Sequence, residues 1–244
     1  MTAVPSTYDE ERAGIAAACR VLAGRGLADG ILGHISWRVE EDLILVRCRG
    51  PRERGLAWTE PADIRLVRLD GSAGARGELE GGYSVPNELP LHSEVLRARP
   101  DDRAVVHAHP PRVVAADLAG IGVRPILGAF DIPGLRLAEG GVPVYPRGVL
   151  VRSTPLALEM VEAMADRPVV ILRGHGLTSA AASVEQAVLQ AISVDWLCDM
   201  SLNVMSAGGE LVDLPAADVA ELPDLGASFN NATAWRHELA RIGG

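Results

Sequence analysis

Two histidines, His107 and His109, stand two residues apart in the stretch AVVHAHPPR, after an apolar run and before two prolines. If this run is a β-strand, both imidazoles project from the same face, because side chains alternate along a strand. Two neighbouring imidazoles suit two adjacent positions around one metal ion. The same pattern also fits a strand end with two incidental histidines, so the pair needs partners elsewhere in the chain.

Two residues elsewhere in the chain are candidates for those partners. His175 stands between two glycines in RPVVILRGHGL, where the backbone bends sharply or another segment approaches closely. Glu88 lies at the start of the helix predicted in PNELPLHSEVLRARPD. Three histidines and one carboxylate form a ligand set that suits Zn²⁺, Mn²⁺, Fe²⁺ or Co²⁺.

Each of these residues also has an ordinary structural interpretation. A carboxylate in the first turn of a helix complements the helix dipole, and a histidine between glycines fits a simple turn. His92 lies four residues after Glu88 on the same helix face, where it is a candidate fifth ligand, proton-relay partner or core residue. Sequence order alone does not show that these side chains meet in space.

The composition excludes several other chemistries. The 244-residue chain is 48% hydrophobic and 23% charged, which is typical of a globular protein. Its net charge of −9 argues against nucleic acid as the main partner, because phosphate binding needs a basic surface. All 23 basic residues are arginines, so Schiff-base, pyridoxal-phosphate and Walker A lysines are excluded. Activating a carbonyl or carboxylate substrate would require another electrophile, such as a metal ion.

The cysteines and the chain ends point to a reducing compartment. Cys19, Cys48 and Cys198 lie far apart without a CxxC motif, so we expect them to be reduced and buried. The first residues lack a basic segment followed by an apolar one, and no apolar run reaches about 18 residues. We therefore expect no signal peptide, no membrane partner and a cytoplasmic location.

Helical and strand-like patterns alternate along the chain, which predicts one α/β domain over residues 1–244 with a less certain tail from about residue 206. The caps expected for three of the helices are Asn87, Thr154 followed by Pro155, and Ser183 with Gln186. Helices are predicted over 8–27, 87–101, 111–120, 154–166, 183–205 and 232–241. Strands are predicted within 34–48, 63–74, 77–85, 103–110 and 167–181, the first segment forming a hairpin.

The order of these motifs resembles the class II aldolase/adducin family. The likeness rests on PNELPLHSEVLRARPDDRAVVHAHPP, on the later RGHGL, and on ADGILGHISWRV, and it covers roughly residues 8–205. It implies a three-layer α/β/α domain around a largely antiparallel sheet, in a homotetramer with sites at subunit interfaces. It also implies one divalent ion per subunit, with His107, His109 and His175 as ligands and Glu88 as a ligand or an acid/base.

Three segments depart from the family pattern where its aldolases hold a sugar phosphate. His34 replaces the asparagine of a Gly-Asn-x-Ser loop, CRGPRERG replaces a Thr-Pro-Ser/Thr-Gly stretch, and Pro86 and Asn87 replace two serines. A phosphorylated ketose is therefore not expected as substrate. His34 is expected to donate to an anionic oxygen or relay a proton, unless it is structural. The segment that supplies a catalytic tyrosine in the aldolases also differs, so Tyr145 is not assigned that role.

The replacement residues suit a carboxylate better than a phosphate. Arginine binds carboxylates through two parallel hydrogen bonds, which makes Arg49, Arg52 and Arg54 candidates for substrate binding. The alternative interpretation of these arginines is a solvated charged loop. Asn87 and His92, on either side of Glu88 in the sequence, are expected to be further substrate contacts.

The expected reaction breaks a carbon–carbon bond. Decarboxylation next to a ring hydroxyl leaves a phenolate, and retro-aldol cleavage leaves an enolate; a metal ion stabilises either as a Lewis acid while Glu88 or His34 moves the proton. In RGPRERGL and GGVPVYPRGVLVR the chain looks most like family members that decarboxylate dihydroxyphthalate or hydroxymethylpyridine dicarboxylate. We therefore expect a metal-dependent, non-oxidative decarboxylase of an ortho-hydroxylated aromatic (di)carboxylate. The alternatives are an aldolase acting on a non-phosphorylated hydroxy-carbonyl compound and an adducin-like binding module without catalysis.

Overall fold

A seven-stranded sheet with the order β3-β2-β1-β4-β7-β6-β5 runs through the computed structural model, which describes residues 8–225 and 229–243. Neighbouring strands are antiparallel except for β5 and β6, which are parallel. The strands are β1 (His34–Glu40), β2 (Leu43–Arg47), β3 (Ile64–Arg68), β4 (Ala104–Ala108), β5 (Val144–Tyr145), β6 (Val169–Leu172) and β7 (Gly176–Ala181).

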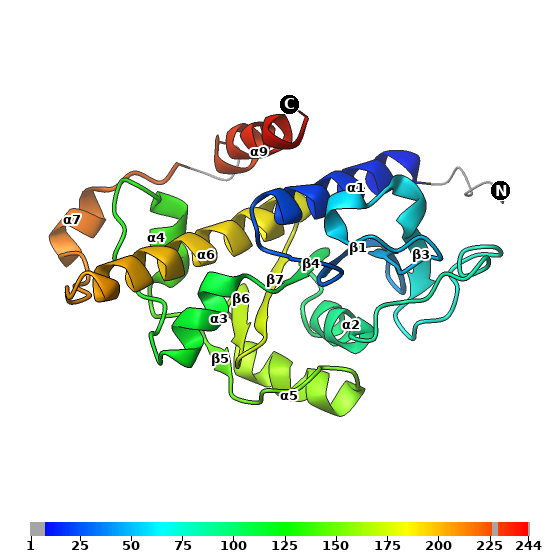
Figure 1. Ribbon diagram of the computed structural model, residues 1–244, viewed down its shortest axis with the longest axis horizontal. Helices are drawn as coiled ribbons and strands as arrows, with labels where there is room; N and C mark the ends of the chain where they lie inside the picture. The colour runs from blue at the N-terminus through cyan, green and yellow to red at the C-terminus, as the bar shows by residue number, and fades with distance from the viewer. Residues whose placement is uncertain (1–7, 226–228, 244) are drawn as a thin grey trace.

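Helices cover both faces of this sheet (Figure 1). They are α1 (Asp9–Gly24), α2 (Leu89–Ala98), α3 (Pro111–Leu118), α4 (Ile132–Ala138), α5 (Thr154–Met164), α6 (Val184–Ser206), α7 (Ala216–Glu221) and α9 (Trp235–Ile242). One core lies between the sheet and α1, α3 and α6, and a second lies between the sheet and α2 and α5. The predicted three-layer α/β/α architecture around a largely antiparallel sheet is therefore confirmed. No helix in the described part of the chain is long and apolar enough to cross a membrane.

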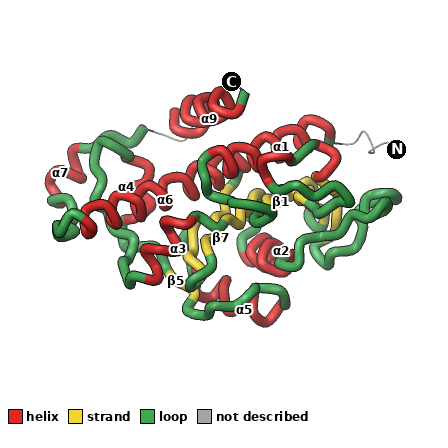
Figure 2. Tube along the Cα trace, viewed as in Figure 1, coloured by secondary structure: helices red, strands yellow, loops and turns green. Residues whose placement is uncertain are grey.

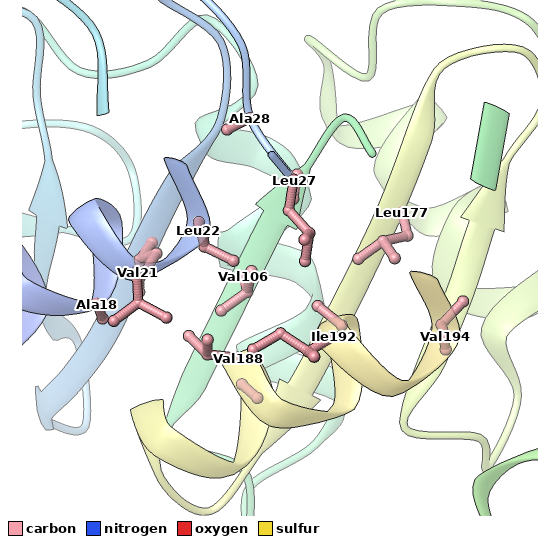
Figure 3. Packing of buried hydrophobic residues seen from close by; sticks show 14 of the residues in the cluster. Ala18, Val21, Leu22, Leu27, Ala28, Val106, Leu177, Val188, Ile192 and Val194 are labelled. Atoms are coloured by element: carbon pink, nitrogen blue, oxygen red, sulfur yellow. The ribbon is translucent and has the colours of Figure 1, made fainter. Parts of the chain in front are cut away.

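Strand β4 sits near the middle of the sheet and contributes to both cores by alternation. Val106 belongs to the first core, where Figure 3 shows it between Leu22 of α1 and Ile192 of α6. Val105 belongs to the second core, under α2 and α5. His107 therefore faces the α2 side, and it is paired across the strands with His34 of β1. The sheet thus presents polar residues of two adjacent strands to the start of α2.

The predicted helices form, with small differences at their caps. Asn87 was expected to cap α2, but this is wrong: Glu88 is the cap, because its carbonyl accepts the first hydrogen bond, from Leu91 N–H at 3.0 Å. Similarly, Thr154 is the first residue of α5 and not its cap. Ser183 does cap α6, as predicted, and its Oγ accepts the Gln186 N–H at 3.2 Å.

One predicted strand, over residues 77–85, does not form. Figure 2 shows loop in this part of the chain, and its pairing with the rest of the protein is limited to a single bridge between Arg49 and Ser84. Gly77, Gly81 and Gly82 all have positive φ angles, which are incompatible with an extended strand. The short elements α4, β5 and α7 were not predicted from the sequence.

The three cysteines are buried and unpaired, as expected. Helix α6 ends at Ser206, where the sequence predicts the less certain tail to begin, and α9 overlaps the predicted C-terminal helix. The expectation of no signal peptide rests on residues 1–14, of which residues 1–7 lie outside the described residues. That residues 1–244 form a single domain stays a prediction.

Candidate metal centre

The four predicted ligand residues meet at one place in the structure. Glu88, His107, His109 and His175 each offer one ligand atom, and these four atoms lie within 4.8 Å of one another. They come from three separate segments: the start of α2, the end of β4 and the turn between β6 and β7. Five of the six histidines of the chain gather around this point, and the sixth, His237, lies on α9.

His107 is oriented by a hydrogen bond on the far side of its ring. Its Nδ1 lies 3.0 Å from the Leu177 carbonyl oxygen, which can only accept, so Nδ1 carries the proton and Nε2 presents a lone pair. Nε2 is buried without a hydrogen-bond partner and lies 3.3 Å from Oε2 of Glu88. Two electron-rich atoms thus face each other in a water-poor interior, an arrangement that a cation between them would stabilise.

Glu88 occupies the middle of the cluster. Its Oε1 accepts the Val151 N–H at 2.9 Å, while Oε2 lies 3.8 Å from Nε2 of His175. Burial would raise its pKa, but hydrogen bonding and charge interactions with the protonated forms of His107 and His175, together with the Val151 N–H, outweigh burial and lower the pKa to about 2. Glu88 is therefore an ionised carboxylate at neutral pH, the form that binds metal ions.

His109 and His175 complete the cluster from two loops. The backbone N–H of His109 donates to Leu27 O at 2.9 Å, and the two imidazole rings have centroids 4.6 Å apart. Gly174 has φ +61°, and a Cβ on Gly176 would lie 2.2 Å from Ala108 O, so both the predicted sharp bend and the predicted close approach occur here. Burial lowers the pKa of His109 to about 3 and also lowers that of His175, so both imidazoles are neutral.

These features fit a divalent cation. Ligands about 2.0–2.1 Å from a tetrahedral ion lie about 3.3 Å from each other, close to the 3.3 Å and 3.8 Å between Oε2 of Glu88 and the two histidines. The donor set is one carboxylate oxygen and three imidazole nitrogens, which are the ligand types that divalent zinc and related ions accept. The assignment of these four residues as ligands is a proposal that the geometry supports.

His34 and His92 lie next to this cluster. Nε2 of His34 is 3.9 Å from Oε2 of Glu88, and burial, followed by the nearby His92 and His107, lowers the pKa of His34 well below its usual range. His92 is fully buried, with Nε2 2.6 Å from Nδ1 of His34 and Nδ1 2.7 Å from Oγ of Ser36. Both ring nitrogens of His92 are therefore engaged by protein groups, and it is not among the four clustered ligand residues.

The arginines expected to bind substrate do not act as one group. The backbone of Arg49 pairs with Ser84, just before Glu88 in the chain, and Arg52 is exposed in a turn. Arg54 instead contacts Glu60, with 3.4 Å between Nη2 and Oε1, and lies over the Trp58 ring. Their role in substrate binding stays a prediction.

Asn87 and Tyr145 differ in their access to solvent. Asn87 is exposed and lines a polar cavity of about 520 Å³ together with Arg152 and Thr154. Tyr145 is buried on β5 and its hydroxyl donates to Glu159 at 3.0 Å, so the structure gives it no place in the cluster. A larger cavity of about 710 Å³ between α4, α6 and α9 contains none of the predicted site residues.

Comparison with known proteins identifies the family. Residues 13–202 match the model of the Class II Aldolase and Adducin N-terminal domain. The chain belongs to this family. Within it, the chain is 76% identical over 238 residues to a 3,4-dihydroxyphthalate decarboxylase of Arthrobacter keyseri, covering 98% of this chain and 96% of that protein. A 3,4-dihydroxyphthalate decarboxylase of Terrabacter sp. (strain DBF63) is 65% identical, covering 97% of this chain and 98% of that protein.

A solved structure of this family also shares the fold. The aldolase II superfamily protein from Pseudomonas syringae has a TM-score of 0.79 at 23% identity, covering 98% of this chain and 94% of that chain. The predicted resemblance to the class II aldolase/adducin family, and to its dihydroxyphthalate decarboxylase branch, is therefore confirmed.

The structure adds Asp117 to the residues that shape the candidate site of this class II aldolase family member. Its Oδ2 accepts the Gly174 N–H at 2.7 Å, and its Oδ1 lies 3.1 Å from Nε of Arg173. Asp117 thus holds the turn that carries His175. No local sequence pattern predicts this contact, because Asp117 lies in α3, 57 residues before Gly174.

We expect Asp117→Ala to weaken divalent-metal affinity about tenfold to 100-fold, because residues that orient metal ligands have effects of this size. Competition with a chromophoric chelator measures this affinity. Asp117→Asn keeps an oxygen that accepts the Gly174 N–H and should lose much less. Arg173→Leu is the matched control, since it removes only the half-exposed ion pair. An Asp117→Ala variant that binds metal as tightly as the parent protein would show that the turn needs no such support.

Proposed function

We propose that this chain is a metal-dependent, non-oxidative decarboxylase of 3,4-dihydroxyphthalate, that is, a carboxy-lyase acting on an ortho-hydroxylated aromatic dicarboxylate. The relatives that bear this name are 76% and 65% identical over nearly their whole length. The observation that carries the proposal is the cluster of Glu88 with three histidines, a ligand set that suits a divalent metal ion in a chain without lysine. The same cluster argues against a binding module that has lost catalysis.

The chemistry of the substrate explains why such a site is needed. In 3,4-dihydroxyphthalate the C2 carboxylate is next to the C3 hydroxyl. When C2 is protonated and the C3 hydroxyl loses its proton, the C3 oxygen becomes a ketone β to that carboxylate. The C2–carboxylate bond then breaks, its electrons pass to the C3 oxygen, and CO₂ and 3,4-dihydroxybenzoate result. A bound divalent ion supplies a Lewis acid that draws electron density toward the oxygen atoms of the substrate.

The residues of the chain supply the proton chemistry. Glu88 is ionised, and the Val151 N–H fixes one of its oxygens, so its other oxygen is directed into the cluster as a ligand or a base. His34 is the next group able to exchange a proton, with Nε2 3.9 Å from that oxygen. We assign Glu88 and His34 as the catalytic residues, in line with the usual preference for carboxylate and imidazole in such roles.

The carboxylate that remains on the ring needs a cationic partner. We assign this role to Arg49 and Arg52, with Asn87 as a neutral donor. Arg152 is a further candidate, because it lines the same polar cavity as Asn87 and directly follows Val151, whose N–H holds Glu88. The family resemblance also leads us to expect a homotetramer. The ligand types lead us to expect one Zn²⁺, Mn²⁺, Fe²⁺ or Co²⁺ per subunit, and the sequence features described above a cytoplasmic location.

A panel of substrates tests this function. We expect CO₂ and 3,4-dihydroxybenzoate from 3,4-dihydroxyphthalate, and deuterium at C2 of the product when the reaction is run in D₂O. The matched control is 4,5-dihydroxyphthalate, which has no hydroxyl next to a carboxylate. We expect it to react at least about 100-fold more slowly, because the loss of one proton-transfer contribution lowers a rate by about this factor. Aldehyde release from non-phosphorylated hydroxy-keto acids, with no CO₂ from either phthalate, would instead identify an aldolase.

A further inference from the structure

A row of three buried side chains leads through the second core to the metal centre. Ser36 and His34 are alternate residues of β1 and face α2, while His92 lies one turn after Glu88 on that helix. The Oγ of Ser36 is 2.7 Å from Nδ1 of His92, and Nε2 of His92 is 2.6 Å from Nδ1 of His34. All three residues are more than nine-tenths buried, so solvent does not compete for these hydrogen bonds.

The row has two possible proton arrangements. In the first, the Ser36 hydroxyl donates to Nδ1 of His92, Nε2–H of His92 donates to Nδ1 of His34, and His34 carries its own proton on Nε2. In the second, each histidine is protonated on Nδ1, the donation runs the other way, and the hydroxyl of Ser36 must find another acceptor. A neutral imidazole has one donor and one acceptor, so no other arrangement satisfies the row.

Two observations favour the first arrangement. Among the described residues, His92 is the one hydrogen-bond partner of the Ser36 hydroxyl, so the second arrangement would leave a buried hydroxyl proton unpaired, at a cost of about 1–3 kcal/mol. In addition, Nε2 of His34 faces Oε2 of Glu88, a carboxylate oxygen with lone pairs, at 3.9 Å. A proton on Nε2 is attracted to that carboxylate, whereas a lone pair is repelled.

We propose that Ser36 and His92 are positioning residues that hold His34 in its Nε2–H tautomer, with that proton facing the metal centre. His34 then presents a donor to an anionic oxygen of a bound molecule. It offers no lone pair to the metal, which explains why it stays outside the ligand set although its ring centroid is only 5.0 Å from that of His107. The catalytic consequence rests on the proposed function, but the tautomer itself does not.

Neutron diffraction from crystals of the deuterated protein tests the tautomer directly. We expect deuterium on Nε2 of His34, on Nε2 of His92, and on Oγ of Ser36 pointing at His92. Deuterium on Nδ1 of His34 would overturn the proposal. This result is independent of the decarboxylase assignment: a protein with the expected tautomer but no CO₂ release would keep the positioning role and refute the proposed function.

A matched pair of variants tests the consequence for catalysis. The amide of glutamine reaches about as far as Nε2 of histidine, so His92→Gln can still donate to Nδ1 of His34. The amide of asparagine reaches only the position of Nδ1, next to Ser36, so His92→Asn cannot. We expect His92→Asn to lower kcat about 100-fold, Ser36→Ala about tenfold, and His92→Gln to recover most of the loss, with metal content unchanged in all three. Equal losses in the Gln and Asn variants would contradict a positioning role.

Discussion

His109→Ala is expected to lose both the bound metal and CO₂ release. The substitution removes one of the four residues whose ligand atoms lie within 4.8 Å of one another. His109 is the best residue for this test because it is only partly buried and follows β4, so its loss disturbs the core less than loss of the fully buried His107. Its backbone hydrogen bond to Leu27 is kept.

Elemental analysis of the purified variant and a chelator-competition titration measure this effect. We expect metal affinity to fall at least about 100-fold. Losing a direct ligand weakens metal binding more than losing a residue that only orients a ligand, which costs up to about 100-fold. The matched control is His237→Ala on α9, which removes a histidine that lies away from the cluster and from its neighbours His34 and His92, and should keep both metal and activity. A His109→Ala protein with full metal occupancy would refute the ligand assignment.

Replacing Glu88 is expected to stop turnover, by about 10²–10⁴-fold, because the ionised carboxylate is lost from the centre. The structure also predicts a difference between two substitutions. In Glu88→Gln we expect the Val151 N–H to hold the amide oxygen at the position of Oε1. The amide NH₂ then takes the position of Oε2 and donates to the lone pair on Nε2 of His107. In Glu88→Ala all three imidazole lone pairs stay open. We therefore expect the Gln variant to bind metal more weakly than the Ala variant.

Metal titrations and decarboxylation assays on the two variants separate these effects. Glu238→Gln is the matched control, because Glu238 is a buried glutamate paired with Arg25 and lies on α9, away from the cluster. Turnover surviving in either Glu88 variant would show that Glu88 is not an acid/base. Unchanged metal affinity in Glu88→Gln would show that the ion is held without Glu88.

Most of the regular structure follows from local patterns. Helical spacing in α1 and α5 reflects which face each helix buries, and the short apolar runs of β2 and β4 between turn residues are typical of buried strands. The segment 77–85 has a strand-like composition, but its glycines adopt positive φ angles and break the extended backbone. Short elements such as β5, with two residues, contain too few residues to show a period.

The candidate site is predictable in parts. That His107 and His109 point the same way follows from strand alternation, and that Glu88 and His92 share a helix face follows from their spacing. Their convergence depends on the strand order that places β4 between β1 and β7, and long-range pairing of this kind leaves no local pattern. Here the family resemblance brought the residues together, and the structure agrees with it.

Other contacts in the site also join residues that are far apart in the chain, so the sequence does not predict them. Ser36 faces His92 across 56 residues of chain, and a serine within a strand carries no distinguishing pattern. In the arginine-rich loop, nearness in the sequence suggests a common role for Arg49, Arg52 and Arg54. In the structure Arg54 instead contacts Glu60 and Trp58.

The most direct measurement follows CO₂ release from 3,4-dihydroxyphthalate while a divalent ion is removed and then restored. The protein is first stripped with a chelator and then titrated with Zn²⁺, Mn²⁺, Fe²⁺ or Co²⁺ in parallel. If Glu88 and the three histidines hold the ion on which decarboxylation depends, the stripped protein is inactive and at least one of these ions restores activity at one equivalent per chain. A stripped protein that releases CO₂ at the undiminished rate would contradict this account.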